Sequence, residues 1–309
     1  MCAKINITTS TFGIHSKKPI SLLNQKGLSI KLNELNRKLT TDELIKQARE
    51  ANGIIAGTES YSKEVLDQLP NLKVISRLGV GMDSIDLKAT KQKGIKIFKT
   101  KTSPAQAVAE LSLGLLLDVV RKITAQNNDV KIGIWQKKMG NLLYGKTLGI
   151  IGLGTIGKTL VKLVKGFDFK IMAFDMFHDD KFAKEHEVNY CDIGTLLTQS
   201  DIVSIHLNLT SETNTLMNKE RIAALKPGCI FINTSRGEII NEDALYVALK
   251  EKHIFGAGLD VFREEPYSGP LLELNNVILT PHIGSYAKEI RIKMEIEAAE
   301  NLIRGLNEE

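Results

Sequence analysis

Residues Thr147–Ile151, with the sequence TLGII, run directly into Gly152–Gly157, with the sequence GLGTIG. The first stretch is typical of a strand buried on both faces, because its apolar side chains do not alternate with polar ones. A helix is expected to follow, through about Lys165. A buried strand that ends in such a glycine-rich turn and continues as a helix is typical of a doubly wound α/β sheet.

This turn and the carboxylate after the next expected strand together predict a dinucleotide site. Gly152 permits the tight turn, Gly154 lets the backbone approach a pyrophosphate, and Gly157 packs the helix against the strand. Asp175 follows about 20 residues later, where it would bind ribose hydroxyls and repel the extra phosphate of NADP. We therefore expect NAD as the cofactor. The expected contacts in the turn are Gly152, Gly154, Thr155, Ile156 and Gly157.

Short apolar runs alternate with helix-length segments through the rest of this region. Asn241 is a candidate N-cap for a helix over Glu242–Lys250, and Pro227-Gly228 would close another around Lys219–Leu225. Such alternation predicts a parallel sheet with helices on both faces. The expected strands are Thr147–Ile151, Lys170–Phe174, Asp201–Ile205, Cys229–Ile232, Phe255–Leu259 and Val277–Leu279.

The first hundred residues repeat this pattern more weakly, which predicts a second α/β domain. A helix is expected from about Asp42 to Glu50, and another over Pro104 to about Thr124, with the proline in its first turn. In Tyr286–Leu306 apolar residues recur every four positions, which predicts an amphipathic helix that returns to the first domain. The expected strands here are Ile5–Thr8, Gly53–Ala56, Lys73–Ser76 and Ile95–Phe98.

Length and composition indicate a folded protein of about two domains. The chain has 309 residues, 43% hydrophobic and 25% charged, as in globular proteins. Its net charge of +5 comes from scattered basic residues, which favours a small anionic substrate over nucleic acid. We expect no secretory leader and no membrane span, because the most apolar stretch, Leu111–Val120, is too short. Cys2, Cys191 and Cys229 have no disulfide or metal-site spacing, so we expect no metal and a cytoplasmic location.

Polar or ionisable residues follow nearly every expected strand of the second domain. Parallel strands of a doubly wound sheet present their carboxyl ends to one ligand crevice, so these residues are expected to gather there. Beyond the glycine turn they are Asp175, His206, Asn233–Gly237 with the sequence NTSRG, Asp260, and Thr280–Gly284 with the sequence TPHIG.

Four ordered motifs resemble those of the D-isomer-specific 2-hydroxyacid dehydrogenases. They are GLGTIG at Gly152–Gly157, NTSRG at Asn233–Gly237, GLDVFREEP at Gly258–Pro266 and TPHIG at Thr280–Gly284. The resemblance covers about Asn71 to Glu300 and is strongest to D-3-phosphoglycerate dehydrogenases. The segments behind that preference are RLGVGMD at Arg77–Asp83, WQKK at Trp135–Lys138 and GKTLG at Gly145–Gly149. Residues 1–70 match only loosely.

The resemblance implies how the two domains are organised. A Rossmann NAD-binding domain, residues 101–284, would be inserted into a flavodoxin-like substrate domain, residues 1–100 and 285–309. The active site would lie in the cleft between them and close by hinge motion. The resemblance also implies a short form without a C-terminal regulatory domain, and a homodimer joined through the nucleotide domains, with Pro104–Thr124 as a candidate contact.

The resemblance also implies catalytic roles. Oxidising a 2-hydroxy acid removes a proton from oxygen and a hydride from carbon, so the site needs a base, a hydride acceptor and a carboxylate anchor. His282 would be the acid/base, and Arg236 would hold the substrate carboxylate. Glu265 would fix the imidazole tautomer and favour its protonated form. Pattern alone does not choose between Glu264 and Glu265, and the family register selects Glu265.

The remaining implied contacts are spread over both domains. Backbone N–H groups of Gly79–Gly81 could bind the substrate carboxylate. Arg77 would reach a substrate phosphate or form a strand-end salt bridge. Ser285-Tyr286 stands where relatives often carry small residues. The implied substrate contacts are Arg77, Gly79, Val80, Gly81 and Arg236. The further implied cofactor contacts are His206, Leu207, Thr213, Thr234, Ser235, Arg236, Asp260, His282 and Gly284, with Asp260 near the nicotinamide amide.

Structural alternatives remain for four of these residues. Asp175 could cap a loop, His282 could pack at a turn, Arg236 could form a surface ion pair, and His206 could be a satisfied polar residue. The first function hypothesis is oxidation of 3-phosphoglycerate with NAD, in serine biosynthesis. A second is reduction of glyoxylate or hydroxypyruvate, and a third, from another class, is an NADH-sensing scaffold like the corepressors that share this fold.

Overall fold

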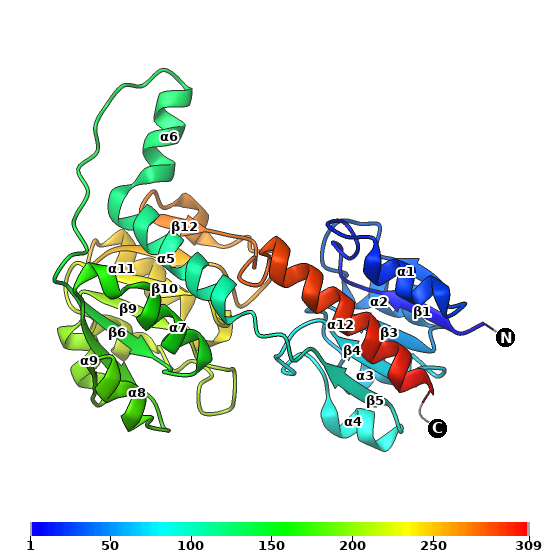
Figure 1. The fold of residues 1–309 in the computed structure, drawn as a ribbon. Helices are drawn as coiled ribbons and strands as arrows, with labels where there is room; N and C mark the ends of the chain where they lie inside the picture. The colour runs from blue at the N-terminus through cyan, green and yellow to red at the C-terminus, as the bar shows by residue number, and fades with distance from the viewer. Residues whose placement is uncertain (1, 308–309) are drawn as a thin grey trace. The chain divides into compact units, whose positions relative to one another are not determined.

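The chain forms two compact units in the computed structural model, which describes residues 2–307 (Figure 1). Unit 1 comprises the described residues of Met1–Pro104 and Ser285–Glu309, and unit 2 is Ala105–Gly284. Unit 2 is therefore one continuous stretch of chain, whereas unit 1 is assembled from two.

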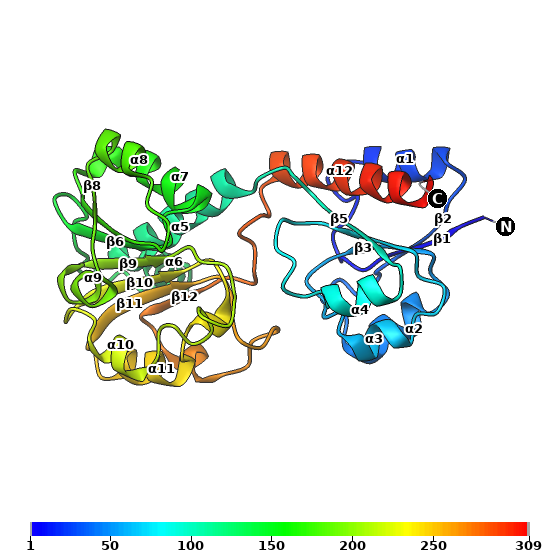
Figure 2. The same ribbon diagram turned by 90° about the horizontal axis from the view of Figure 1, so that it is seen from below.

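Unit 1 is built on a parallel sheet of five strands in the order β2-β1-β3-β4-β5, the flavodoxin-like order. Helices α1 and α12 cover one face of the sheet, and α2, α3 and α4 cover the other (Figure 2). The strands are β1 Lys4–Ile7, β2 Ser29–Leu32, β3 Gly53–Ala56, β4 Val74–Arg77 and β5 Lys96–Lys99. The helices are α1 Lys18–Gln25, α2 Thr41–Ala48, α3 Lys63–Asp67, α4 Leu87–Gln92 and α12 Lys288–Asn307.

Two of the helices in unit 1 show why the sequence folds as it does. Helix α2 begins after a capping box, in which the Thr40 hydroxyl accepts the Glu43 N–H while the Glu43 carboxylate accepts the Thr40 N–H. Helix α12 buries Met294, Ala298 and Leu302, which confirms the expected spacing of four. The second segment of the chain thus supplies part of the core of unit 1.

Unit 2 is built on a parallel sheet of seven strands in the order β12-β11-β10-β9-β6-β7-β8. The strand order reverses between β6 and β9, the position at which such sheets bind dinucleotides. The strands are β6 Thr147–Ile151, β7 Lys170–Phe174, β8 Val188–Tyr190, β9 Ile202–Ile205, β10 Cys229–Asn233, β11 Ile254–Leu259 and β12 Val277–Leu279.

Helices lie on both faces of this sheet, with α5 and α7 on one and α10 and α11 on the other (Figure 2). The α-helices are α5 Ala105–Arg121, α6 Ile123–Lys131, α7 Thr155–Leu163, α8 Asp180–Glu185, α9 Ile193–Gln199, α10 Lys219–Ala223 and α11 Glu242–Lys250. Short 3₁₀ turns occur at Lys165–Phe167, Gly237–Ile239 and Pro270–Glu273. The expected fold class, two doubly wound parallel sheets, is confirmed.

Three details differ from the expected elements. Strands β2 and β8 were not expected, because edge strands are short and partly polar and leave little hydrophobic signal. The segment from Pro104 is two helices rather than one, since Lys122 adopts a left-handed φ of 53° between α5 and α6. Pro104 immediately precedes α5 instead of lying in its first turn.

Candidate active site

The turn after β6 has the geometry that its glycines predict. Gly152 has φ of +98°, and a Cβ built there would lie 2.6 Å from the carbonyl oxygen of His206. A Cβ on Gly157 would lie 2.4 Å from the carbonyl oxygen of Gly152, so α7 packs directly on the turn. Gly154 is the N-cap of α7, receives no side-chain cap, and has open space around its Cβ position. The start of α7 is therefore accessible to a phosphate group.

Asp175 lies beside this turn, directly after β7. Its Oδ2 accepts the Leu153 N–H at 2.7 Å and its Oδ1 accepts the Phe177 N–H at 2.9 Å. Thr155 and Ile156 are the first two residues of α7. The structure thus brings together the glycine turn, the helix start and the carboxylate, as the sequence predicts.

His206 follows β9 and is buried, with 9% of its surface exposed. Its Nε2 lies 2.9 Å from Ser204 Oγ, whereas its Nδ1 has no hydrogen-bond partner among the described residues. Burial lowers the pKa of His206 to about 4, so the ring is neutral at pH 7. Leu207 lies against the Gly152 turn, and Thr213 Oγ1 donates to the carbonyl oxygen of Asn208 at 2.7 Å.

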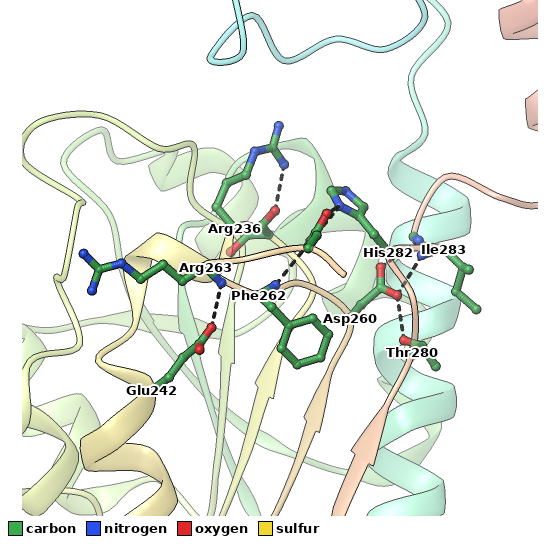
Figure 3. Close-up of polar contacts among 11 residues, drawn as sticks. Arg236, Glu242, Asp260, Phe262, Arg263, Thr280, His282 and Ile283 are labelled. Carbon is green, nitrogen blue, oxygen red and sulfur yellow. Dashed lines mark hydrogen bonds and ion pairs between the residues drawn. The ribbon is translucent and has the colours of Figure 1, made fainter. Parts of the chain in front are cut away.

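Asp260, directly after β11, braces the loop that carries His282. Its Oδ1 accepts the Thr280 hydroxyl at 2.6 Å and the Ile283 N–H at 2.8 Å, and its Oδ2 accepts the Gly284 N–H at 2.8 Å (Figure 3). Burial raises the pKa of Asp260, and these hydrogen bonds oppose the rise. The carboxylate therefore holds the backbone of the loop in place, a role that the sequence did not indicate.

Arg236 belongs to the loop after β10. Asn233 shapes this loop, because its Nδ2 donates to the carbonyl oxygen of Arg236 at 2.9 Å and its Oδ1 accepts the Ser235 N–H and hydroxyl. The Arg236 guanidinium donates to the Ser235 carbonyl oxygen at 2.7 Å. Thr234 and Ser112 share a buried hydroxyl contact of 2.8 Å. The side chain of Arg236 is thus held on the edge of the sheet that carries His282 (Figure 3).

The central contact of the site joins His282 and Glu265. The His282 Nδ1 lies 2.9 Å from Glu265 Oε2 and 3.0 Å from Oε1 (Figure 3). The backbone of His282 adopts φ of 55° and its N–H donates to the carbonyl oxygen of Asp260 at 2.9 Å. Glu265 Oε1 also accepts the Phe262 N–H at 3.2 Å, while Glu264 is exposed. Of the two adjacent glutamates, Glu265 is the one that meets the histidine.

The expected substrate loop follows β4 in unit 1. Arg77 is buried, with 7% of its surface exposed, and its guanidinium donates to the carbonyl oxygen of Leu78 and lies 3.5 Å from that of Ala56. Gly79 has φ of +150°, and a Cβ built there would lie 2.8 Å from the Arg77 guanidinium. The arginine therefore packs against the backbone of its own loop.

A buried polar cluster that the sequence did not predict lies at the ends of β1 and β3. Thr8 Oγ1 donates to Glu59 Oε2 at 2.8 Å and lies 3.1 Å from the Tyr61 hydroxyl, and Glu59 Oε2 accepts the Gly57 N–H at 3.1 Å. Burial raises the pKa of Tyr61. These residues follow β1 and β3, and the polar residues at those strand ends were the signal that could have found them.

Residues 2–307 lack two further features, a metal site and a membrane-spanning helix. Among these residues, no group of three His, Cys, Asp or Glu side chains could hold a metal ion. No helix within the same range is long and apolar enough to cross a membrane.

A glycine-rich turn at the switch point of a doubly wound sheet, with a histidine–carboxylate pair at the same edge of that sheet, is typical of a dinucleotide-dependent dehydrogenase. Residues 113–284 match the model for the NAD binding domain of the D-isomer specific 2-hydroxyacid dehydrogenases. The chain belongs to this family. It is an NAD-dependent oxidoreductase that acts on CH–OH groups, which decides against the scaffold hypothesis.

Relatives along most of the chain support this assignment. A hydroxypyruvate reductase from Thermotoga maritima is 36% identical over 308 residues, covering 96% of this chain and 98% of that protein. A glyoxylate reductase from Thermococcus litoralis is 40% identical over 271 residues, covering 84% and 82%. A D-3-phosphoglycerate dehydrogenase from Archaeoglobus fulgidus is 35% identical over 293 residues, covering 93% of this chain but 55% of that protein. A crystal structure from Thermus thermophilus has a TM-score of 0.87 at 34% identity and covers 98% of this chain and 96% of that one.

Unit 2 fits the NAD of this family. The open space at Gly154 would admit the pyrophosphate. The Asp175 carboxylate beside the turn would accept hydrogen bonds from the ribose hydroxyls. The buried Nδ1 of His206 adds a polar atom, without a partner among the described residues, at the same edge of the sheet.

Proposed function

We propose that the protein interconverts a short 2-oxo acid and its D-2-hydroxy acid, with His282 as the acid/base. The contact between His282 Nδ1 and Glu265 carries this proposal. A carboxylate can only accept, so Nδ1 carries the proton of this hydrogen bond, and Nε2 on the far side of the ring exchanges the proton with the substrate oxygen. Bound NAD accepts or donates the hydride.

The other proposed roles follow from charge and position. Arg236 anchors the substrate carboxylate and stabilises negative charge on the reacting oxygen, for which its planar fork is suited. Glu265 holds the imidazole in one orientation by accepting a hydrogen bond from the proton on Nδ1. In unit 1, we propose that the N–H groups of Gly79–Gly81 contact the substrate carboxylate.

For the substrate, we favour hydroxypyruvate or glyoxylate over a phosphorylated acid. Arg77, the expected phosphate ligand, is buried beneath Gly79 with its guanidinium directed at backbone carbonyl groups. Relatives named hydroxypyruvate reductase and glyoxylate reductase support the same choice. The second candidate is 3-phosphoglycerate, which is favoured by the segments at Arg77–Asp83 and Trp135–Lys138 and by relatives of that name.

Steady-state kinetics with paired substrates test the proposal. We expect NADH-linked reduction of hydroxypyruvate and glyoxylate with kcat/KM at least 10-fold above that for 3-phosphohydroxypyruvate. The reverse order would favour the phosphorylated substrate and a serine-biosynthetic role. No turnover on any of these, or on pyruvate, would contradict the proposed substrate class.

We also propose that the protein is a homodimer, joined through the segment 123–144 of unit 2. Helix α6 projects from unit 2 and a non-helical stretch returns from it (Figure 1). The segment exposes large apolar side chains that a monomer would leave in water: Val130 50%, Ile132 73%, Trp135 86%, Met139 88%, Leu142 74% and Tyr144 67%. The resemblance suggested Pro104–Thr124 as the dimer contact, but helix α5, which makes up most of that segment, buries its apolar face within unit 2. A second copy of the chain is the partner that we propose, because in a two-fold symmetric dimer each copy covers the exposed apolar segment of the other.

A further inference from the structure

In the loop that carries Glu265, two consecutive backbone N–H groups each donate a hydrogen bond to a carboxylate. The Phe262 N–H donates to Glu265 Oε1 at 3.2 Å, and the next N–H, that of Arg263, donates to Glu242 Oε1 at 2.6 Å (Figure 3). The first of these bonds lies within the loop. The second ties the loop to a different element, helix α11.

Glu242 is mounted on a fixed part of unit 2. It is the first residue of α11, directly after the N-cap Asn241, whose side chain accepts the Ala244 N–H at 2.9 Å. The same helix buries Leu245 and Leu249 in the core of unit 2. Glu242 is half-buried, and burial raises its pKa. A half-buried carboxylate on a packed helix is a rigid acceptor, unlike a solvated surface acid.

The rest of the loop is fixed by contacts other than Glu242. A Cβ built on Gly237 would lie 2.0 Å from the carbonyl carbon of Phe262, so that backbone has no room to move toward Gly237. The Phe262 ring stacks on Tyr267 with centroids 4.5 Å apart. The Asp260 N–H donates to the Asn233 carbonyl oxygen at 3.0 Å. The peptide between Phe262 and Arg263 is therefore held in two ways, by close packing against Gly237 and by the hydrogen bond from its N–H to Glu242.

We propose that Glu242 is a positioning residue for the reaction. By accepting the Arg263 N–H it fixes the loop conformation that keeps Glu265 against Nδ1 of His282. This inference rests on the proposed function, in which His282 transfers the proton. Its rival is that Glu242, as an acid in the first turn of α11, only stabilises the helix through the helix dipole.

Three variants separate these two roles. We expect Glu242→Ala to lower kcat by roughly 10- to 100-fold, the range for groups that orient a reacting side chain, with the dissociation constant of NADH unchanged. Glu242→Gln keeps an acceptor oxygen for the Arg263 N–H, so its kcat should stay within about 3-fold of the parent enzyme. Asp243→Asn is the matched control, because Asp243 is an exposed acid in the same first turn. It should leave kcat unchanged.

A double-mutant cycle tests whether Glu242 acts through Glu265. If it does, Glu242→Ala should reduce kcat much less in a Glu265→Ala background than in the parent enzyme, because the contact between Glu265 and His282 is already lost there. Equal fold-losses in both backgrounds would show an independent effect and overturn the inference. So would an equal loss of kcat in Glu242→Ala and Asp243→Asn.

The outcome for Glu242 is separate from that for the proposed function. If His282→Asn and Glu265→Ala retain full turnover, the acid/base assignment is wrong whatever Glu242 does. If both lose turnover and Glu242→Ala does not, only the positioning role is wrong. Thermal unfolding of each variant shows whether a loss of kcat comes from a loss of folded protein.

Discussion

His282 Nδ1 lies 2.9 Å from Glu265 Oε2, although the two residues come from separate loops and the histidine has a left-handed backbone. Asp260 maintains this arrangement, since its two carboxylate oxygens accept N–H groups of Ile283 and Gly284. The backbone of two loops therefore positions this side-chain pair. Asp260 holds the loop of His282, and Glu242 holds the loop of Glu265.

Replacing His282 should abolish turnover and spare cofactor binding. Asparagine is the substitution to use, because it tolerates the φ of 55° that this position requires. We expect kcat of His282→Asn to fall by roughly 10²- to 10⁴-fold, the usual contribution of a general acid or base. Fluorescence titration with NADH should give a dissociation constant close to that of the parent enzyme. A parallel loss of NADH binding would place His282 in the cofactor site instead.

Asp175 should set the preference for NAD over NADP. Its carboxylate lies at the glycine turn, held by the N–H groups of Leu153 and Phe177. Asp175→Asn removes the charge that repels the extra phosphate, so the ratio of kcat/KM for NADH to that for NADPH should fall by roughly 10-fold or more. Asp180→Asn, an exposed acid at the start of α8, serves as the control. An unchanged ratio in Asp175→Asn would contradict this role.

Alanine substitutions at two glycines of the turn should have different effects, one on the stability of the protein and the other on cofactor binding. A Cβ on Gly157 would meet the Gly152 carbonyl oxygen at 2.4 Å, so Gly157→Ala should lower the free energy of unfolding by about 1–3 kcal/mol. A Cβ on Gly154 meets open space, so Gly154→Ala should change it by less than about 0.5 kcal/mol. The added methyl group would then stand where the pyrophosphate approaches and weaken NADH binding. Urea unfolding and NADH titration of both variants check these expectations. Normal NADH affinity in Gly154→Ala would contradict the proposal that the pyrophosphate binds at Gly154.

Burial of His206 should make the protein less stable in acid. Its pKa is about 4 in the folded protein and about 6.5 when unfolded, so below pH 6.5 the unfolded chain binds more protons. The contribution of neutral His206 to the free energy of unfolding is therefore fully present above about pH 6.5 and is lost as the pH falls toward 4. Between pH 7.5 and pH 5 the loss amounts to about 2 kcal/mol. Urea unfolding of the parent and of His206→Gln across this range should show a shallower acid loss in the variant; parallel curves would contradict the assignment.

The exposed apolar segment should set the oligomeric state. Replacing Trp135 and Met139 by serine should convert a dimer into a monomer in light-scattering measurements, because both side chains are more than four-fifths exposed in a single chain. Leu272→Ser, at another exposed apolar position of unit 2, should leave the dimer intact. Trp135 is the single tryptophan, so its fluorescence should shift to longer wavelength when the parent protein is diluted. A parent protein that is monomeric at micromolar concentration would contradict the proposed dimer.

The sequence predicted the parts of the structure that depend on local pattern. The central strands and the turn at Gly152 follow from burial on both faces and from the glycines that a tight turn requires. The edge strands β2 and β8 could not be predicted, because they are short and lack that hydrophobic signal. The direction of the Arg77 side chain and the bond from Glu242 to Arg263 are tertiary contacts that no spacing along the chain indicates.

Because unit 2 is one uninterrupted stretch of chain, it has everything its core needs before synthesis of the protein is finished. Unit 1 does not, since Met294, Ala298 and Leu302 of α12 help to fill its core and are made after unit 2. On the ribosome the nucleotide unit should therefore fold first, while the earlier-made first hundred residues wait with one face of their sheet covered by α1 alone. A nascent chain stalled before α12 would leave the apolar part of that face normally covered by α12 open to chaperones and to aggregation.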